Sequence, residues 1–417
     1  MAITAQWNNT NRVYSSDFIG QILKPLIIAA SSDQTAQPKF KYQIRVNVGA
    51  TEVLRMLYPV NQSNDALVDI ATVIASECSP ELRDNATPLY RLPFSGDVLF
   101  QPNFGDAVKW VSVQIFEYYA ASATTTPSPE LSATVQGLFI WSHNEFVSFD
   151  GIDPVTFKPN TTTSRFLTDQ PTRTTIALNE DLTFAYFNDS NQINSPNAST
   201  QIRFEYSNGT VQSVTNTSFV PTVPTNANRG NYVLHVGAGT GNIERTTSHS
   251  IPAGVTWMKV YMDDGAGNKL SQVYHFDIVE YCDESFRLMF VNRYGFWDYF
   301  TFDKGYKNNA RVTRTEFKKT YGNYNGTSYS YNQNERGIEN NVEAERNYTL
   351  NSRYLTEEES IWLEQLITSP SVYWIDGSVM KPIIITDTNY ENKSSRYDGN
   401  FNLIVNFKLS HEIRTQW

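Results

Sequence analysis

The sequence predicts an all-β protein, built mainly of antiparallel β-sandwich domains with one or two short helices packed on the sheets. Three observations predict this class. Apolar and polar residues alternate in many short segments, which is typical of strands with one buried face. Asn-Gly and Asp-Gly pairs recur along the chain, and such pairs favour tight hairpin turns. Only two segments show the periodicity of a helix.

The strand pattern is clearest in residues 40–48, 202–206 and 401–409, where apolar residues recur at every second position. β-branched and aromatic content predicts further strands at 108–119, 183–187, 232–236, 257–262, 273–279, 286–291 and 383–386. Candidate turns are Asn208-Gly209, Asp264-Gly265, Asp376-Gly377 and Asp398-Gly399. The short spacing between strands and turns favours sandwiches over units that alternate strand and helix.

Two helices are predicted. In residues 64–77 the apolar residues Leu67, Ile70, Ala71 and Ile74 form one stripe that ends before Pro80. The second helix spans 356–367. It opens with a capping box, in which Thr356 precedes Glu359 by three residues, and its acidic first turn suits the positive end of the helix dipole.

The length of 417 residues allows several compact domains, and 40% apolar residues provide enough material for their cores. We expect three: an N-terminal β domain with one helix (1–149), an immunoglobulin-like sandwich (150–279) and a C-terminal β domain with one helix (280–417). Residues 150–160 carry two prolines and are the better linker candidate. The small, polar segment 120–132 is expected to be a long hairpin tip or a surface loop.

Charge and cysteine content exclude several classes of protein. The net charge of −10 disfavours a dedicated nucleic-acid binder, which neutralises phosphates with Lys and Arg. Two cysteines, Cys78 and Cys282, are too few for a disulfide scaffold or a cysteine zinc site, and we expect reduced thiols. The first residues lack the pattern of a secretory signal, and no apolar run has membrane-spanning length. We expect a protein made in the cytosol that contacts no membrane.

No motif predicts catalysis, a cofactor or a bound metal. The five histidines are scattered singly and form no metal-ligand spacing, and there is no nucleophile elbow. We expect His235 and His275 to be strand residues with structural hydrogen bonds. The glycines of 237–241 resemble a phosphate loop only superficially, because the following residues suggest a strand, so a β turn is expected. Asp263–Asn268 is a conceivable calcium loop, but a hairpin tip is the preferred interpretation.

Residues 304–319 reverse the overall acidity. This segment contains Lys304, Lys307, Arg311, Arg314, Lys318 and Lys319. It is a candidate surface for DNA or for an acidic partner; the alternative is a solvated strand face paired with Glu335, Glu339, Glu343 and Glu345. The next segment, 321–331, is rich in Tyr, Asn, Gly and Ser, a composition that suits contact loops and also an exposed hairpin without a partner.

Residues 285–302 suggest a family. An apolar strand, the turn Asn292–Gly295 and an aromatic strand containing Asp298 follow one another, and Phe286, Leu288 and Phe290 are expected to meet Phe300 and Phe302. This segment resembles virion structural proteins of tailed phages that infect Bacteroidota, the crAss-like group included. The helix at 356–367 and the segments 369–375, 381–385 and 401–409 are similar to the end-of-chain β unit of that group. The resemblance covers about a third of the chain.

The resemblance implies a non-enzymatic component of the tail, neck or portal-proximal ring or hub, located in the virion after assembly in the host cytoplasm. Expected partners are other copies of the chain in a ring, other tail or portal proteins, and genomic DNA in passing. Ring contacts use two different faces of each subunit. Because Trp and Tyr dominate binding hot spots, the candidate interface anchors are Trp297, Tyr321, Tyr324, Tyr329 and Trp374.

Two alternatives remain at this stage. One is a receptor- or carbohydrate-binding β protein of the virion or of a bacterial surface, with exposed aromatic side chains that stack on sugars. The other is a polysaccharide-degrading enzyme, which needs a pair of carboxylates. Proximity in the sequence makes Asp263, Asp264, Asp283 and Glu284 the candidates for that pair.

Overall fold

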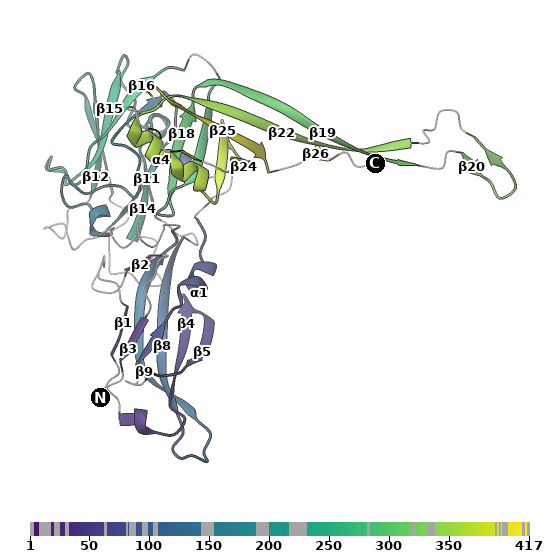
Figure 1. Ribbon diagram of the computed structural model, residues 1–417. Helices are drawn as coiled ribbons and strands as arrows, with labels where there is room; N and C mark the ends of the chain where they lie inside the picture. The colour runs from purple at the N-terminus through teal and green to yellow at the C-terminus, as the bar shows by residue number, and fades with distance from the viewer. Residues whose placement is uncertain are drawn as a thin grey trace. The chain divides into compact units, whose positions relative to one another are not determined.

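The computed structural model confirms the all-β class (Figure 1). It describes residues 4–7, 18–20, 26–29, 33–61, 65–80, 82, 89–93, 99–102, 107–142, 154–188, 200–216, 232–281, 284–318, 322–331, 338–387, 390–391, 393, 399–410 and 413–414. The chain forms two compact units. Unit 1 comprises residues 1–280 and 291–298, and unit 2 comprises residues 281–290 and 299–417. The three expected domains remain a prediction, since the first two fall within unit 1.

The first sheet of unit 1 has the strand order β2-β9-β8-β4-β5. Its strands are β2 Phe18–Gly20, β4 Lys41–Val48, β5 Thr51–Tyr58, β8 Val108–Tyr119 and β9 Ser128–Ile140. In β4 every second residue, including Tyr42, Ile44 and Val46, is buried. The predicted alternation therefore marks the face that packs on this core. The segment 120–132 was expected as a hairpin tip or surface loop; residues 120–127 are the tip of the β8–β9 hairpin, and residues 128–132 belong to β9.

A second, three-stranded sheet has the order β1-β3-β6. It consists of β1 Thr4–Trp7, β3 Leu26–Ala29 and β6 Ala66–Val68. The helix predicted over 64–77 is wrong in its first half, since only α1 Ala71–Ser76 is helical. Leu67 pairs with Ile27 in the sheet and its side chain is 65% exposed, so this pairing overrides the helical stripe.

Two further sheets of unit 1 face each other. One has the order β10-β16-β15-β12-β13 and the other β11-β14-β7. Phe184 of β11 contacts Tyr274 and Phe276 of β16, with ring centroids 4.9 and 6.3 Å apart. The strands are β7 Phe100–Pro102, β10 Arg173–Ala177, β11 Thr183–Phe187, β12 Gln201–Tyr206, β13 Val211–Thr215, β14 Val233–Gly237, β15 Trp257–Asp263 and β16 Tyr274–Val279. Short helices are η1 Asp33–Ala36, η2 Leu89–Arg91, η3 Pro154–Phe157 and α3 Thr240–Glu244.

Unit 2 is one large antiparallel sheet with a helix on it, in the order β18-β17-β23-β24-β25-β22-β19, with β26 paired to β22. Its strands are β17 Phe286–Val291, β18 Trp297–Phe302, β19 Lys304–Lys318, β22 Ile338–Tyr354, β23 Val372–Asp376, β24 Val379–Ile385, β25 Asn402–Leu409 and β26 Ile413–Arg414; β20 Asn323–Tyr324 and β21 Tyr329–Ser330 form a separate hairpin. The predicted contact of Phe286, Leu288 and Phe290 with Phe300 and Phe302 is confirmed, because all five lie in one core cluster.

Helix α4 Glu357–Thr368 covers the core of unit 2 and confirms the second predicted helix. Trp362, Leu363 and Leu366 face the sheet and are buried. The capping box is present: Thr356 Oγ1 accepts a hydrogen bond from the Glu359 amide at 3.1 Å, and Glu359 Oε2 accepts one from the Thr356 amide at 3.0 Å. These bonds satisfy two amides that the helix leaves unpaired.

Replacing Thr356 with alanine is expected to lower the free energy of unfolding of unit 2 by about 1 kcal/mol, because the Glu359 amide loses its acceptor. Urea unfolding followed by circular dichroism measures this change. The Thr356→Ser variant keeps the hydroxyl acceptor and is the matched control, with an unfolding midpoint close to that of the unaltered chain. An alanine variant as stable as the serine variant contradicts the capping role.

Unit 1 should lose stability in alkaline solution. Burial raises the pKa of Tyr42 and of Tyr90 to about 12, above the usual value of 10.0. In the unfolded chain these phenols ionise above pH 10, while the folded chain keeps them neutral up to about pH 12. Stability is therefore complete below pH 10 and falls as the pH rises through 12, on the order of 1 kcal/mol per pH unit for each tyrosine. Equal urea midpoints at pH 9 and pH 11.5 contradict this expectation.

The segment 291–298 contains the turn between β17 and β18 with the adjoining ends of both strands, and it belongs to unit 1. The Asn292 amide donates to the Phe296 carbonyl at 2.7 Å, and the Gly295 amide donates to the Asn292 carbonyl at 2.9 Å. Gly295 has φ +89°, and a Cβ there would lie 1.8 Å from the carbonyl oxygen of Trp141. Only glycine fits this position, because any side chain collides with the Trp141 backbone.

Candidate interaction surface: the β19–β22 ribbon

The candidate surface of unit 2 is a two-stranded ribbon formed by residues 307–318 of β19 and 338–349 of β22. The two strands pair from Lys307↔Thr349 to Lys318↔Ile338 without a register shift (Figure 1). β25 pairs with β22 only from Asn347 onward, and β26 pairs only at Glu343 and Ala344. Within the described residues, 314–318 and 338–342 therefore pair only with each other over about 17 Å.

A two-stranded ribbon alone in water is marginally stable, because it buries little apolar surface. In β19 every described side chain from Lys307 to Glu316 is exposed, and Val312 retains 42% of its surface. Among the β22 side chains whose burial is described, from Glu343 onward, the core residues Tyr348 and Leu350 lie at its base. Residues 307–316 of β19 thus contribute no side chain to the core of unit 2 and are open to contact.

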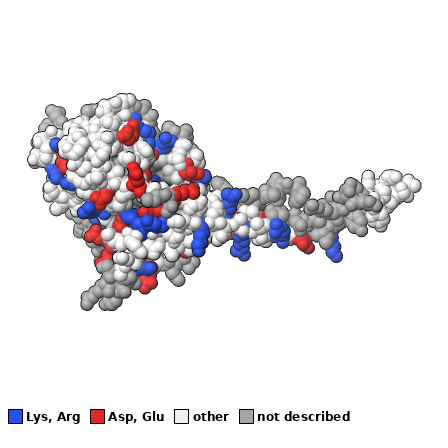
Figure 2. All heavy atoms as spheres, turned by 90° about the horizontal axis from the view of Figure 1, so that it is seen from above, with Lys and Arg blue, Asp and Glu red and all other residues white. Residues whose placement is uncertain are grey.

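The predicted basic segment lies along this ribbon. Lys304, Lys307, Arg311, Arg314 and Lys318 are all exposed residues of β19, and Lys319 falls outside the described residues. On the face shown in Figure 2, Lys and Arg side chains are spaced along the ribbon. The register pairs four of the five with Asn351, Thr349, Val342 and Ile338, none of which carries a charge. The ribbon as a whole, residues 307–318 and 338–349, holds five basic and four acidic residues, a net charge of +1, and only Arg311 among these cations has a carboxylate directly opposite.

The predicted pairing of these cations with Glu335, Glu339, Glu343 and Glu345 is only partly confirmed. Glu345 lies opposite Arg311, but Glu343 lies opposite Thr313 and Glu339 opposite Phe317, while Glu335 is outside the described residues. Lys408 donates to Glu345 at 2.5 Å. This hydrogen bond lowers the pKa of Glu345 below its usual value, and the nearby charge of Arg311 lowers it further. Glu345 is therefore shared between two cations.

The hairpin β20–β21 lies between β19 and β22 in sequence and carries three exposed tyrosines. Tyr324, Tyr329 and Tyr331 are 64%, 41% and 71% exposed. The rings of Tyr329 and Tyr331 pack edge to face at 5.1 Å. The Asn325 side chain accepts hydrogen bonds from the amides of Thr327 and Ser328, which fixes the turn between the two strands. The aromatic rings are thus held outward by a defined turn.

The five candidate anchors divide into three groups. Tyr324 and Tyr329 are exposed, as an anchor requires, and Tyr321 lies outside the described residues. Trp297 does not meet the requirement, because it is only 4% exposed. Trp374 packs partly buried against Phe286 at 4.8 Å and beneath Lys381. Both tryptophans lie in apolar strands, whose side chains pack on the core. The prediction of Trp297 and Trp374 as interface anchors, which used residue type alone, is therefore wrong. Tyr331 was not predicted, although it ends the same Tyr-rich run.

The glycine-rich segment 237–241 cannot hold a phosphate, because its amides are already used. The Gly239 amide donates to Leu182 and to Asn242 Oδ1, and the Gly241 amide donates to Glu180. The expectation of a plain β turn leading to a strand is wrong: α3 begins at Thr240. The Asn242 side chain caps this short helix and also donates to the carbonyls of Tyr90 and Leu92 at 2.7 and 2.8 Å. The glycines permit this close packing.

The segment Asp263–Asn268 is a hairpin tip, as preferred over a calcium loop. The buried Asp263 accepts from Arg203 at 2.8 Å and from the Gly265 amide at 2.9 Å. Asp264 accepts from the amides of Ala266 and Asn268 and from the Asn268 side chain at 2.7 Å. Hydrogen bonds with Asn268 lower the pKa of Asp264. Both carboxylates therefore stabilise their own loop.

The other carboxylates suggested for an enzyme also lack a paired arrangement. Asp283 is outside the described residues, and Glu284 accepts a hydrogen bond from Tyr306 at 3.0 Å. Among the described residues, no group of three or more His, Cys, Asp or Glu side chains is placed to hold a metal ion. His275 contacts Asp277 at 3.1 Å and His235 is buried beside Phe296, in keeping with structural roles for both. The thiol of Cys78 packs at the edge of the first core, and Cys282 is not described.

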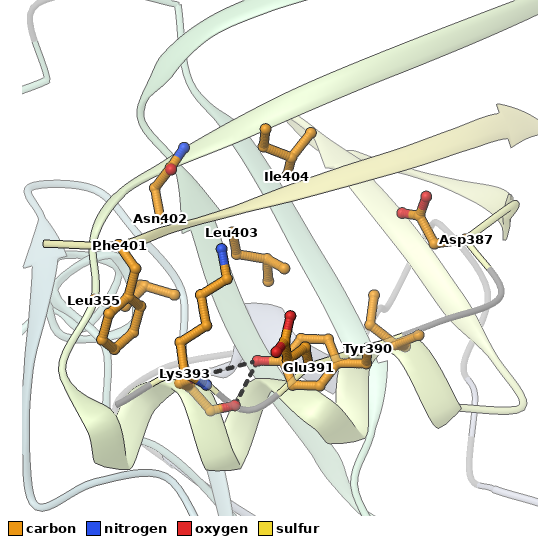
Figure 3. A pocket seen from close by; sticks show the side chains of 11 residues that line it. Leu355, Asp387, Tyr390, Glu391, Lys393, Phe401, Asn402, Leu403 and Ile404 are labelled. Atoms are coloured by element: carbon orange, nitrogen blue, oxygen red, sulfur yellow. Dashed lines mark hydrogen bonds between the residues drawn. The ribbon is translucent and has the colours of Figure 1, made fainter. Parts of the chain in front are cut away.

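A hollow of about 210 Å³ lies between Ser360 and Ile367 of α4 and the described residues 387, 390–391, 393 and 401–404 (Figure 3). Tyr390 closes one side by donating to the Ser360 carbonyl at 2.5 Å. Asp387, one of two carboxylates on its wall beside Glu391, accepts from the Asn406 amide and side chain at 2.7 and 2.8 Å. The volume is below that of usual ligand pockets, and Asp387 already has structural partners. The hollow does not define an active site.

A buried polar cluster holds the turn 291–298 within unit 1. Asp298 accepts from Thr168 Oγ1 at 2.8 and 2.9 Å and from Asn292 Nδ2 at 2.9 Å. Beside it, Asp169 accepts from the Tyr294 hydroxyl at 2.7 Å and pairs with Arg293. Burial raises the pKa of Tyr294, and the charge of Asp169 raises it further. Every polar group named here has a structural partner, so this cluster fixes the turn.

Comparison with known proteins yields no family model and no curated protein that matches this chain. The described helices also include none that is both long and apolar enough to cross a membrane. The ribbon with its exposed β19 strand, together with the exposed tyrosines of the β20–β21 hairpin, is the surface on which a functional interpretation rests.

Proposed function

We propose that this chain is a non-enzymatic structural component of a tailed phage virion, part of a ring or hub in the tail, neck or portal-proximal region. Its copies join through contacts between different faces of neighbouring subunits. The virion assignment rests on the resemblance of residues 285–302 and of the C-terminal segments. The proposal of self-assembly rests on the β19–β22 ribbon.

The ribbon supports self-assembly because its strands hold a 12-residue ladder while every side chain of β19 from Lys307 to Glu316 is exposed. A neighbouring subunit that covers the ribbon supplies the apolar burial which the isolated chain lacks. The exposed tyrosines of the β20–β21 hairpin are the residue type that most often anchors such contacts.

The test compares assembly with and without these tyrosines. The purified chain should form higher-mass species in mass photometry as its concentration rises. The triple variant Tyr324→Ser, Tyr329→Ser, Tyr331→Ser should assemble about tenfold more weakly or worse, because each ring removes contact area from a hot spot. Tyr354→Ser is the matched control, since this tyrosine is 69% exposed but lies at the base of β22. If the triple variant assembles like the unaltered chain, the β20–β21 hairpin is not part of the interface.

A second candidate function, carbohydrate binding, has one observation in its favour. Trp257 lies on the outer face of β15, since Met258 and Val260 on the opposite face are buried. His275 lies 5.3 Å from its ring, and Lys259 is 4.7 Å from the ring centroid. A half-buried tryptophan beside polar side chains is suited to stacking on a sugar. A glycan array on which the unaltered chain binds and Trp257→Ala does not bind supports this function.

A further inference from the structure

One buried carboxylate of unit 1 lacks the partners that the other buried acids have. Five Asp and Glu side chains are buried in the described part of the chain. Three of them pair with an arginine: Asp181 with Arg245, Asp263 with Arg203 and Glu359 with Arg353. The fourth, Asp298, accepts hydrogen bonds from two side chains. The fifth is Glu117 of β8, which has neither a cation nor a second donor.

The two oxygens of the Glu117 carboxylate have different surroundings. The residue is only 6% exposed. Its Oε2 accepts a hydrogen bond from the Ser132 hydroxyl at 3.0 Å, whereas its Oε1 is buried and has no hydrogen-bond partner. A buried carboxylate without a counter-charge is costly, because the protein does not replace the solvation that water provides.

A second carboxylate lies beside the first. Glu117 of β8 and Glu130 of β9 are register partners, and directly opposite residues of neighbouring strands point to the same face. Glu130 is exposed, and its Oε2 accepts from the Tyr119 hydroxyl at 2.7 Å. This bond raises the pKa of Tyr119, and the charges of Glu130 and Glu117 raise it further, so both carboxylates lie near one hydroxyl. Like charges in this arrangement destabilise a strand pair unless something compensates them.

The oxygen atoms around the two glutamates suit a hard cation. Ser132 is the extra residue of a β-bulge, because Ile115 pairs with Ala133 and Phe116 pairs with Leu131. Its Oγ lies 3.0 Å from Glu117 Oε2 and 3.4 Å from the carbonyl oxygen of Glu130. Carboxylate, hydroxyl and carbonyl oxygens are ligands of Ca²⁺, which accepts irregular coordination completed by water, whereas Mg²⁺ demands a nearly ideal octahedron. The exposed Glu130 leaves the pair accessible from solvent.

We propose that Glu117 and Glu130, together with the Ser132 hydroxyl, bind one divalent cation of the calcium type near the tip of the β8–β9 hairpin. Since only two carboxylates take part, water completes the coordination. The cation supplies the counter-charge that Glu117 lacks, and it joins β8 to β9 next to the tip formed by residues 120–127. This site does not depend on the proposed assembly, because all of its ligands come from one copy of the chain.

Calorimetric titration of CaCl₂ into the full-length chain, stripped with EDTA, measures the binding. The unaltered chain should bind one Ca²⁺ at this site, and Mg²⁺ more weakly. Glu117→Gln and Glu130→Gln should each weaken Ca²⁺ binding about tenfold or more, since affinity follows the charge of the ligands. Glu52→Gln is the matched control, because it removes the same charge from β5 of the same sheet. If the unaltered chain binds no Ca²⁺, or if Glu117→Gln binds it as tightly as Glu52→Gln does, the site is wrong.

Thermal unfolding separates a cation site from a carboxylate that only makes a hydrogen bond. In EDTA, Glu117→Gln should melt no lower than the unaltered chain, because the amide keeps an acceptor for Ser132 and buries no charge. Added CaCl₂ should raise the melting temperature of the unaltered chain and leave that of Glu117→Gln nearly constant, because only the former binds the cation. A Glu117→Gln variant that melts lower by the same amount in EDTA and in CaCl₂ overturns the proposal.

Discussion

Replacing Trp362 with alanine is expected to lower the free energy of unfolding of unit 2 by about 3 to 5 kcal/mol. Trp362 is 2% exposed and lies beneath α4 in the core of unit 2. Its ring lies 5.8 Å from that of Phe290 and 6.1 Å from that of Phe300, so it joins the helix to β17 and β18. Alanine leaves a cavity that these neighbours fill only in part.

Ile361 provides the matched control, because it is the preceding residue of the same helix and is 61% exposed. Ile361→Ala should change the free energy of unfolding by no more than about 0.5 kcal/mol. Urea unfolding followed by hydrogen exchange in peptides of residues 357–368 separates unit 2 from unit 1. If the two variants lose equal stability, the position assigned to α4 on the sheet is incorrect.

Replacing Asp298 with alanine is expected to lower the free energy of unfolding of unit 1 by about 2 to 4 kcal/mol. The carboxylate accepts from Thr168 and Asn292 inside the protein, where water cannot replace it. Each buried donor that loses its acceptor costs about 1 to 3 kcal/mol. Because the turn 291–298 depends on these bonds, amides of residues 291–298 should also exchange faster.

Asp277→Ala is the control for this variant. The Asp277 side chain is 36% exposed and pairs with Arg173, whose side chain is 72% exposed, so its loss should cost no more than about 1 kcal/mol. Thermal unfolding of the two variants in parallel measures the difference. If Asp298→Ala melts at the same temperature as Asp277→Ala, the buried cluster does not stabilise the turn.

The strands predicted from alternating apolar and polar residues are confirmed where one face of the strand is buried and the other is exposed to solvent. β4 and β12 show buried residues at every second position, as the sequence pattern indicates. β5 was not predicted, because a strand exposed on both faces has no reason to alternate. The helix predicted over 64–77 failed because pairing between Leu67 and Ile27, forty residues apart, is a tertiary effect that local periodicity does not encode.

The candidate surface was only partly predictable. The basic residues of 304–319 and the tyrosines of 321–331 stand out in composition, and their described members are indeed exposed. Their arrangement along a ribbon depends on the pairing of β19 with β22, whose register no single segment specifies. Trp297 was predicted wrongly from its residue type. An aromatic residue suits a core as well as an interface, and only its burial in the structure distinguishes the two.

The most direct test of the central claim is a cryo-electron microscopy map of the assembled, unaltered chain at a resolution that traces strands. The proposal of a self-assembling virion subunit predicts closed rings in which the β19–β22 ribbon of each copy lies against its neighbour. A map of isolated monomers, or of rings whose ribbons extend into solvent without touching another copy, contradicts it.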